Sequence, residues 1–395
     1  MKICMTGLDD VQAPIELREQ LSFTKSAAAE LDRRMVELGC RGAVVLSTCN
    51  RTEVYLSLGE GQDLDPRVLL CQAVGISSGV FDHAFITRWG VDCARHLMEV
   101  ACGLRSQILG EDQILTQVKA AVALAREAGS ADGVLETLFR TAAACGKSAK
   151  AGGRLSGVPT SAAHRAVEVL RERLGTLEGR SALVIGNGEM GRLAAALLRE
   201  AGCRVCVTLR TYRHGETVVP AGCSVVPYEA RYAAMEGTDM VLSATTSPHY
   251  TVTLEPFCGV SRPPRILVDL AIPRDIQPEL AERAAELTLL NIDDLHQNIP
   301  TDQAALDRVH AAVEVYLNRF YQWNTYRESL PALETLKDAL RQRVRAYLEA
   351  GMDPEEAADL AVDKAVELIA GGLPETISAD ALEACAARIR QHTRS

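Results

Sequence analysis

Residues 181–191 read SALVIGNGEMG, a short apolar run that passes directly into three glycines at positions 186, 188 and 191. The helical pattern of residues 192–201 follows at once. A G-x-G-x-x-G segment between a strand and a helix is typical of a dinucleotide-binding turn, because the glycines let a pyrophosphate approach the backbone at the helix N-terminus. A plain glycine-rich turn is the alternative, and the flanking strand and helix favour dinucleotide binding.

The next strand-like run, residues 203–209, ends without an acidic residue that could accept a bond from the ribose hydroxyl of NAD. Arg210 and Arg213 follow it and could pair with a 2′-phosphate, so NADPH is favoured, although an ordinary solvated loop would also explain both arginines. The candidate cofactor-binding residues are Gly186, Asn187, Gly188, Glu189, Met190, Gly191 and Arg210.

Further strand-like runs at residues 240–244 and 266–270 alternate with helical stretches. This alternation predicts a doubly wound parallel sheet of the Rossmann type in a domain of residues 156–300. Asp269, Pro273 and Arg274 lie at the exit of one strand, where a structural or cofactor-positioning role is expected.

The sequence on the N-terminal side mixes strand and helix signals. Residues 3–8, 42–47 and 53–58 read as strands, whereas residues 25–38 and 92–174 have helical spacing. Residues 1–155 are therefore expected to form an α+β domain, with residues 47–52 as a short connection between two strands.

Beyond residue 300 the strand signals stop, so residues 301–395 are expected to form an all-α domain. Its first helix should begin near Thr301 or Asp302 and break or kink at Pro331, and Gly351 should end the run before Asp353 and Pro354 begin another helix. Apolar side chains recur every three or four positions at Leu306, Val309, Val313, Tyr316, Phe320 and Trp323. This stripe favours homodimerisation, with packing inside one chain as the alternative.

Composition limits the classes of protein. The chain has 395 residues, 47% of them hydrophobic, which indicates several globular domains. A formal net charge of −10 argues against a non-specific nucleic-acid binder. There is no run of about 18 apolar residues and no signal peptide at the N-terminus, so a cytoplasmic protein with reduced thiols is expected for the twelve cysteines.

Cys49 is the candidate nucleophile. It lies in the connection Ser47-Thr48-Cys49-Asn50-Arg51-Thr52, and a cation two residues away can depress a thiol pKa. Eleven other cysteines make an ordinary thiol the alternative. A second group consists of His96, Ser106, Glu111, Gln113 and Gln117. Because the last three cannot share one face of a regular helix, a bend at residues 109–112 is expected.

Five segments, in this order and at these separations, resemble glutamyl-tRNA reductase. They are STCNRTE at 47–53, GLRSQILGEDQILTQVK at 103–119, GNGEMG at 186–191, DLAIPRDI at 269–276 and NIDDL at 291–295. The resemblance implies that NADPH reduces glutamyl-tRNA to glutamate-1-semialdehyde through a cysteine thioester, the first step of the five-carbon route to 5-aminolevulinate, porphyrins and other tetrapyrroles. It also implies a homodimer without metal or flavin, and possible transfer of the aldehyde to glutamate-1-semialdehyde aminomutase.

The resemblance assigns roles residue by residue. Cys49 matches the nucleophile, and His96 matches a histidine that could act on the leaving ribose hydroxyl or orient the ester carbonyl. Arg51 would pair with the side-chain carboxylate of the glutamate, and Glu111 would suit its ammonium. The implied substrate-binding residues are Thr48, Asn50, Arg51, Ser106, Glu111, Asp112, Gln113 and Gln117.

The chain departs from the usual family pattern at several positions. Asp9-Asp10 replaces Asn-His, Arg105 replaces an aspartate, and the segment after the second Rossmann strand is unlike the family's Asn-Arg-Thr. Asp112, Thr116 and Asn187 stand where proline, glycine and alanine are usual. None of these changes removes a reacting group.

Two basic clusters could contact tRNA phosphates: Lys147, Lys150 and Arg154, and Arg341, Arg343 and Arg345. Solvated helix faces would explain them equally well. Two other functions also remain open. One is an NADP-dependent dehydrogenase of a small carbonyl compound, similar to shikimate or quinate dehydrogenases. The other is a catalytically idle regulator that binds tRNA or a pathway partner.

Overall fold

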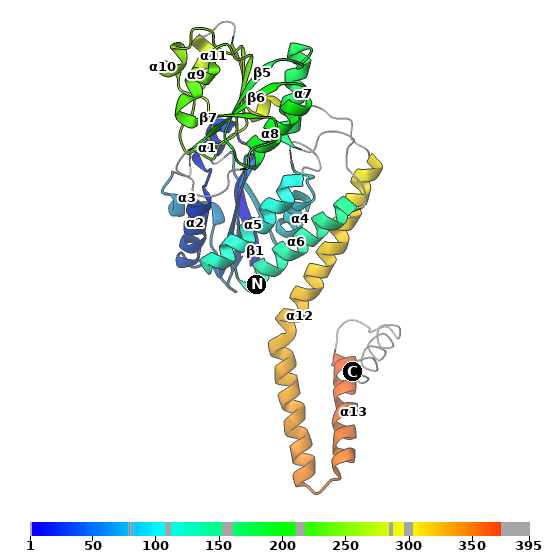
Figure 1. The fold of residues 1–395 in the computed structure, drawn as a ribbon. Helices are drawn as coiled ribbons and strands as arrows, with labels where there is room; N and C mark the ends of the chain where they lie inside the picture. The colour runs from blue at the N-terminus through cyan, green and yellow to red at the C-terminus, as the bar shows by residue number, and fades with distance from the viewer. Residues whose placement is uncertain are drawn as a thin grey trace. The chain divides into compact units, whose positions relative to one another are not determined.

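The structure is a computed structural model that describes residues 2–77, 79, 81, 83–106, 112–151, 161–210, 218–283, 287–295 and 303–372. The chain divides into two compact units, Met1–Tyr321 and Gln322–Ser395. The first unit contains two sheets, one antiparallel and one parallel, each covered by helices (Figure 1). The expected class is confirmed: an α+β part, a Rossmann-type part and a helical C-terminal part.

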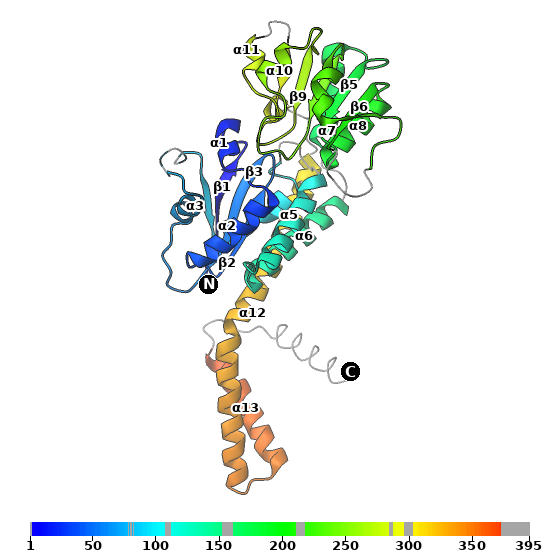
Figure 2. The same cartoon turned by 60° about the vertical axis from the view of Figure 1, so that its left-hand side comes forward.

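The N-terminal sheet is antiparallel, with strand order β2-β3-β1-β4. Its strands are β1 Lys2–Asp9, β2 Gly42–Ser47, β3 Arg51–Leu58 and β4 Ile86–Trp89. The helices of this part are α1 Ile15–Gln20, α2 Lys25–Glu37, α3 Pro66–Val74, α4 Gly90–Ala101, α5 Asp112–Ala128 and α6 Gly133–Ala151. All eight residues of β3 are buried, because helices cover both faces of this central strand (Figure 2).

Side chains of β3 alternate between two apolar layers. Leu56 packs in a cluster with Leu31 and Met35 of α2 and Leu70 of α3. On the opposite face, the ring of Tyr55 meets that of Phe139 from α6 edge to face, with 5.2 Å between centroids. The hairpin tip between β2 and β3 is therefore held by a strand that is buried on both sides.

The second sheet is parallel, with strand order β10-β9-β8-β5-β6-β7. Its strands are β5 Ser181–Ile185, β6 Arg204–Leu209, β7 Ser224–Pro227, β8 Met240–Ser243, β9 Ile266–Asp269 and β10 Thr288–Leu290. The helices around it are α7 Ala162–Leu174, α8 Glu189–Glu200, α9 Arg231–Met235, α10 Leu254–Cys258 and α11 Leu280–Arg283, with 3-10 turns η2 Tyr228–Ala230 and η3 Ile292–Leu295.

Alternate residues of β5 face opposite layers of helices. Val184 packs with Leu170 of α7 and Leu198 of α8, in what we call the Rossmann core cluster. Leu183 and Ile185 pack instead on the layer formed by α9, α10 and α11. The strand order reverses between β5 and β8, and a crevice outside the carboxyl ends of the strands at such a switch point is where dinucleotides bind.

The long helix α12, Gln303–Glu349, begins in the first unit. Val309, Val313 and Phe320 of the expected apolar stripe are buried within the chain itself, and Glu314 forms an ion pair with Arg95 of α4. This part of the stripe is therefore explained by intrachain packing, the alternative weighed above.

Of the break or kink expected at Pro331, the break is wrong, because α12 continues through this residue. Good helix formers such as Leu330, Ala332 and Leu333 surround the proline, so the helix tolerates the loss of one backbone hydrogen bond. Gly351, with φ +85°, ends the run as expected, and Asp353 accepts a bond from the backbone N–H of Glu355 at the start of α13, Pro354–Gly372. The helix expected after Ser378 lies outside the described residues. Among those residues, no helix is both long and apolar enough to span a membrane.

Asp32 on α2 is an unusual core residue, because its carboxyl group is fully buried. Its Oδ1 accepts a hydrogen bond from the backbone N–H of Val45 at 2.8 Å, whereas its Oδ2 has no partner among the described residues. Burial penalises the charged form and raises the pKa of Asp32 to about 7.

We expect Asp32→Asn to remove a pH dependence from stability. The unfolded carboxyl has a pKa of about 4, so the wild type loses stability as the pH rises from that value through about 7. Urea unfolding should show that the wild type loses roughly 4 kcal/mol relative to the variant between about pH 4 and about pH 8, since each pKa unit corresponds to about 1.4 kcal/mol. Glu30→Gln, at an exposed ion pair with Arg33, is the control and should keep the wild-type slope. Equal slopes for Asp32→Asn and the wild type would contradict the assignment.

Candidate active site

Cys49 lies at the tip of the hairpin between β2 and β3. The hydroxyl of Thr48 accepts bonds from the backbone N–H groups of Asn50 and Arg51, both at 3.2 Å, and the N–H of Thr48 donates to the Arg51 carbonyl at 2.8 Å. These bonds hold the three-residue turn in a fixed shape, with the Cys49 side chain half-buried.

Burial separates Cys49 from most other cysteines. Seven of the described cysteines are fully buried: Cys4, Cys40, Cys71, Cys93, Cys102, Cys145 and Cys203. Burial raises the pKa of Cys4 to about 12 and that of Cys40 to about 11, which suppresses the thiolate. Besides Cys49, only Cys206, Cys223 and Cys258 have some exposure among the described cysteines, and all three lie on the Rossmann part.

Glu53 is the centre of a buried polar cluster behind this hairpin. Its carboxylate is 1% exposed, and Oε1 accepts bonds from Arg51 and from His96 Nε2, each at 2.7 Å. Its Oε2 accepts a bond from the hydroxyl of Tyr55 at 2.6 Å. Burial alone would raise the pKa of Glu53, but His96 and Arg51 hold it well below its usual range. The carboxylate is therefore ionised and fixes the orientation of both partners.

Both terminal nitrogens of Arg51 have partners in this arrangement. One terminal nitrogen donates to Glu53 and the other to the backbone carbonyl of Arg105. Burial works against the charge, but Glu53 and then Asp10 raise the pKa of Arg51. These two bonds use two of the five N–H donors of the guanidinium, so a substrate carboxylate could pair with Arg51 while the bond to Glu53 stays in place.

Two buried polar atoms in or next to the buried polar cluster around Glu53 are available to a ligand. They are Oδ1 of Asn50, a residue that is 7% exposed, and Nδ1 of His96. Within the described part of the chain neither atom has a hydrogen-bond partner. Buried polar atoms without a partner are costly, so each is suited to a bond from a bound molecule.

The second group of candidates is only partly described. Ser106 is half-buried and follows Arg105, whose carbonyl contacts Arg51. Gln113 and Gln117 are half-buried and lie one turn apart on α5, hence on the same face. Glu111, the side chain of Asp112 and the expected bend lie outside the described residues.

The glycines of residues 186–191 form the expected cradle. Gly186 has φ +106°, and a Cβ atom there would collide with the carbonyl oxygen of Ala244. A Cβ atom on Gly191 would collide with the carbonyl of Gly186, whereas the space beside Gly188 at the start of α8 is open. Open space in front of a helix N-terminus, at the switch point of the sheet, fits a pyrophosphate.

The side chains in this loop have distinct surroundings. Asn187 donates to the backbone carbonyl of Val218 at 3.0 Å, and its Oδ1 is buried without a partner among the described residues. Glu189 is exposed, and Met190 packs against the Rossmann core cluster.

Arg210 is exposed at the end of β6, and its guanidinium lies 4.6 Å from the ring centroid of Tyr228. Arg231 lies over the same ring at 4.2 Å and donates to the carbonyl of Thr251. Sequence reasoning missed Tyr228 and Arg231, which no motif marks. Arg213 lies outside the described residues.

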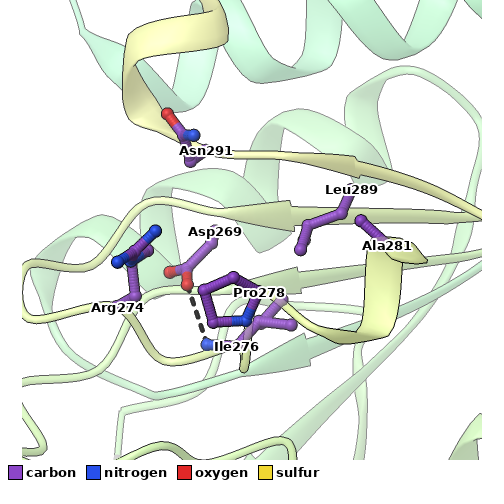
Figure 3. A pocket seen from close by; sticks show the side chains of 7 residues that line it. All are labelled: Asp269, Arg274, Ile276, Pro278, Ala281, Leu289 and Asn291. Carbon is purple, nitrogen blue, oxygen red and sulfur yellow. Dashed lines mark hydrogen bonds between the residues drawn. The ribbon is translucent and has the colours of Figure 1, made fainter. Parts of the chain in front are cut away.

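A cavity of about 180 Å³ lies at the carboxyl ends of β9 and β10 (Figure 3). Its lining residues are Asp269, Arg274, Ile276, Pro278, Ala281, Leu289 and Asn291. It is smaller than the roughly 300–1,000 Å³ of most ligand pockets, and it is away from the β5–β8 switch point. Asp269 accepts bonds from the backbone N–H groups of Ala271 and Ile276, and burial, reinforced by Asp275, raises its pKa well above normal. Asp269 thus holds the loop after β9 in place.

Cys49 also contacts the parallel-sheet part of the molecule. Its side chain packs against the Rossmann core cluster, as do Met190 of the glycine loop and Ile272 of the loop after β9. The hairpin with the candidate nucleophile and the loop with the candidate cofactor site therefore meet at one apolar cluster.

Comparisons with known proteins agree with this arrangement. A family model described as "Glutamyl-tRNAGlu reductase, N-terminal domain" matches residues 6–152, and one described as "Shikimate / quinate 5-dehydrogenase" matches residues 168–298. The glutamyl-tRNA reductase of Acetivibrio thermocellus is 40% identical over 84% of this chain and 99% of its own length. That of Alkaliphilus oremlandii is 38% identical with the same coverage.

Among solved structures, the glutamyl-tRNA reductase from Methanopyrus kandleri is 26% identical with a TM-score of 0.48, covering 99% of this chain and 98% of that one. The dehydrogenase family model covers only the Rossmann part, whereas the bacterial reductases align along both parts of the first unit. The chain therefore belongs to the glutamyl-tRNA reductase family of oxidoreductases.

Proposed function

We propose that this enzyme reduces glutamyl-tRNA to glutamate-1-semialdehyde with NADPH, through a thioester on Cys49. The observation that carries the proposal is the position of Cys49, which lies at the hairpin tip, next to a buried Arg51–Glu53–His96 cluster and against the Rossmann core cluster. The product is the precursor of 5-aminolevulinate, so the reaction begins porphyrin and other tetrapyrrole synthesis. The names of the relatives support the substrate.

In the first half-reaction the sulfur of Cys49 attacks the ester carbon of glutamyl-tRNA. A carbon–sulfur bond forms, the carbon–oxygen bond to the tRNA ribose breaks, and the ribose oxygen takes up the proton that the thiol gave up. A thioester accepts a hydride more readily than an ester, so the covalent step divides a hard reduction into two easier ones. His96, held through Nε2 by Glu53, has Nδ1 left to orient the ester or to move this proton.

Arg51 is proposed to bind the side-chain carboxylate of the glutamate. The bond from Arg51 to Glu53 would stay in place, because it balances the buried charge, and the carboxylate would take other N–H donors of the guanidinium. Asn50 offers the unpartnered Oδ1 described above. The remaining proposed substrate-binding residues are Thr48, Ser106, Glu111, Asp112, Gln113 and Gln117.

The Rossmann part is of a kind that binds a nicotinamide dinucleotide. We propose NADPH, with its pyrophosphate on residues 186–191 and its 2′-phosphate on Arg210. The bound cofactor supplies the hydride that, with one proton, converts the thioester to the aldehyde and returns Cys49 to the thiol. The glycines supply close backbone approach, and α8 supplies the positive end of its dipole.

The remaining assignments follow from the family. We propose a glutamyl-tRNA-binding catalytic domain of residues 1–155, an NADPH-binding domain of residues 156–300 and a dimerisation domain of residues 301–395. In the second unit Leu348, Leu360, Val362 and Val366 are exposed apolar side chains, which supports a homodimer. Charged tRNA as substrate places the reaction in the cytoplasm, and transfer of the aldehyde to glutamate-1-semialdehyde aminomutase is part of the proposal.

We expect Cys49→Ser to abolish NADPH oxidation on addition of glutamyl-tRNA, by at least about a thousandfold. Loss of NADPH absorbance measures the reaction, with uncharged tRNA and free glutamate as substrate controls. Cys258→Ser, at the exposed cysteine, is the matched control and should retain activity. Oxidation that needs neither charged tRNA nor Cys49 would favour the small-molecule dehydrogenase, and tRNA binding without oxidation would favour the regulator.

We expect Glu53→Gln to lower kcat/KM by roughly a hundredfold, because both Arg51 and His96 lose the charge that orients them. Tyr55→Phe removes only one bond to the same carboxylate and should cost less than about tenfold. Steady-state kinetics with glutamyl-tRNA measures both. Equal losses of kcat/KM in the two variants would show that the carboxylate charge is not what orients Arg51 and His96 for the reaction.

Arg210→Ser should raise KM for NADPH roughly tenfold and leave KM for NADH unchanged, because only the 2′-phosphate loses its partner. Arg204→Ser, exposed at the other end of the same strand, is the control. A parallel rise for both cofactors would assign Arg210 to another part of the nucleotide or to the fold.

A further inference from the structure

The short helix α1 is anchored on the Rossmann part although it belongs, by sequence, to the N-terminal part. Ile15 is a member of the Rossmann core cluster. Glu19 accepts bonds from the Arg274 side chain at 2.9 Å and from its backbone N–H at 2.6 Å. Just beyond the helix, Ser22 donates to the carbonyl of Ile272. One face of α1 is thus fixed to the loop after β9.

Arg18, in the middle of this helix, connects three segments through one guanidinium group that is 3% exposed. Its Nε donates to the Ala13 carbonyl at 3.1 Å and its Nη1 to the carbonyl of Cys49 at 2.9 Å. Its Nη2 donates to both carboxylate oxygens of Asp293, at 2.5 and 2.6 Å. A single rigid group therefore contacts the nucleophile's own backbone and the far edge of the Rossmann sheet.

Asp293 is itself held in place. It lies in η3, directly after β10, and its backbone N–H donates to the side chain of Asn291 at 2.7 Å. A guanidinium is planar, and its nitrogens are fixed relative to one another, so its partners are fixed relative to one another as well. A shift of η3 would consequently be transmitted to the Cys49 turn.

We propose that Arg18 is a positioning residue. It fixes the position of the Cys49 carbonyl, and with it that of the thiol, relative to the Rossmann part. The Nη1 bond holds the cysteine turn in shape, which both half-reactions need. The Nη2 pair with Asp293 holds the Rossmann part at the turn, which only the reduction needs. This inference rests on the proposed function, because it assigns the two bonds to that function's two half-reactions.

The test separates thioester formation from reduction. Asp293→Ala removes the carboxylate and leaves Arg18 its bonds to Ala13 and Cys49, since water can reach the half-exposed Asp293 position. Arg18→Lys keeps the positive charge but loses the planar guanidinium that contacts Cys49 and Asp293 together. Thioester formation is measured without NADPH, as radiolabelled glutamate that stays on acid-precipitated protein, and reduction as NADPH oxidation by the same preparation. Glu236→Ala, at an exposed ion pair with Arg262 in the Rossmann part, is the matched control.

Asp293→Ala should form the glutamyl adduct within about twofold of the wild-type rate and lose at least about tenfold in reduction. Arg18→Lys should lose about tenfold or more in both. The control should change neither. The proposal is overturned if Asp293→Ala slows both half-reactions equally or slows neither, and Asp293→Ala alone decides the matter if Arg18→Lys does not fold.

A failure of the proposed function would look different. In that case the wild type itself would hold no labelled glutamate. The rate of Cys49 alkylation by iodoacetamide, followed by peptide mass spectrometry, would still test the Cys49 contact. Arg18→Lys should change that rate by at least about twofold, whereas Asp293→Ala should leave it unchanged. Equal alkylation rates in Arg18→Lys and the wild type would show that Arg18 does not position the cysteine.

Discussion

A carboxylate without access to water must be paired on both oxygens, and Glu53 meets this requirement with Arg51, His96 and Tyr55. Its position on β3, a strand buried on both faces, leaves it no route to solvent. The charges of this cluster can therefore not rearrange independently: Arg51 stays extended toward Arg105, and His96 presents the nitrogen that Glu53 does not use. The Cys49 turn directly precedes β3 and takes its position from the same strand.

The sequence predicted the parts of the fold that have strong periodicity. The glycine segment, the first strands of the parallel sheet and helices α2 and α8 are confirmed, because each combines a clear apolar period with a clear end signal. Strand β4 and helices α1 and α3 were missed, since four to nine residues are too few to establish a period. Helix α12 does not break at Pro331, because a long helix can absorb one missing backbone bond.

The residues of the site also fall into those that a local pattern could predict and those that it could not. Arg51, Glu53 and Tyr55 alternate along one strand, so their common face could have been predicted from period two. His96 is 43 positions from Glu53, and Asp293 is 275 positions from Arg18, and no local pattern connects such pairs. Two departures from the family pattern also meet at Arg51: Asp10 acts on its charge, and the Arg105 backbone accepts its bond. Only the folded chain shows that these scattered changes surround one guanidinium.

A reaction in two steps on one sulfur places two demands on the protein. The sulfur must first meet a large ester and afterwards a hydride donor bound to a different part of the chain, so the geometry between those parts matters as much as that within either. An apolar contact alone would let them slide, because dispersion and burial have little direction. Helix α1, six residues long, adds directed, charge-assisted bonds: Arg18 donates to Asp293, and Glu19 accepts from Arg274. A helix of this length would not be stable alone. It is thus ordered by its contacts with the two parts whose relative position it fixes.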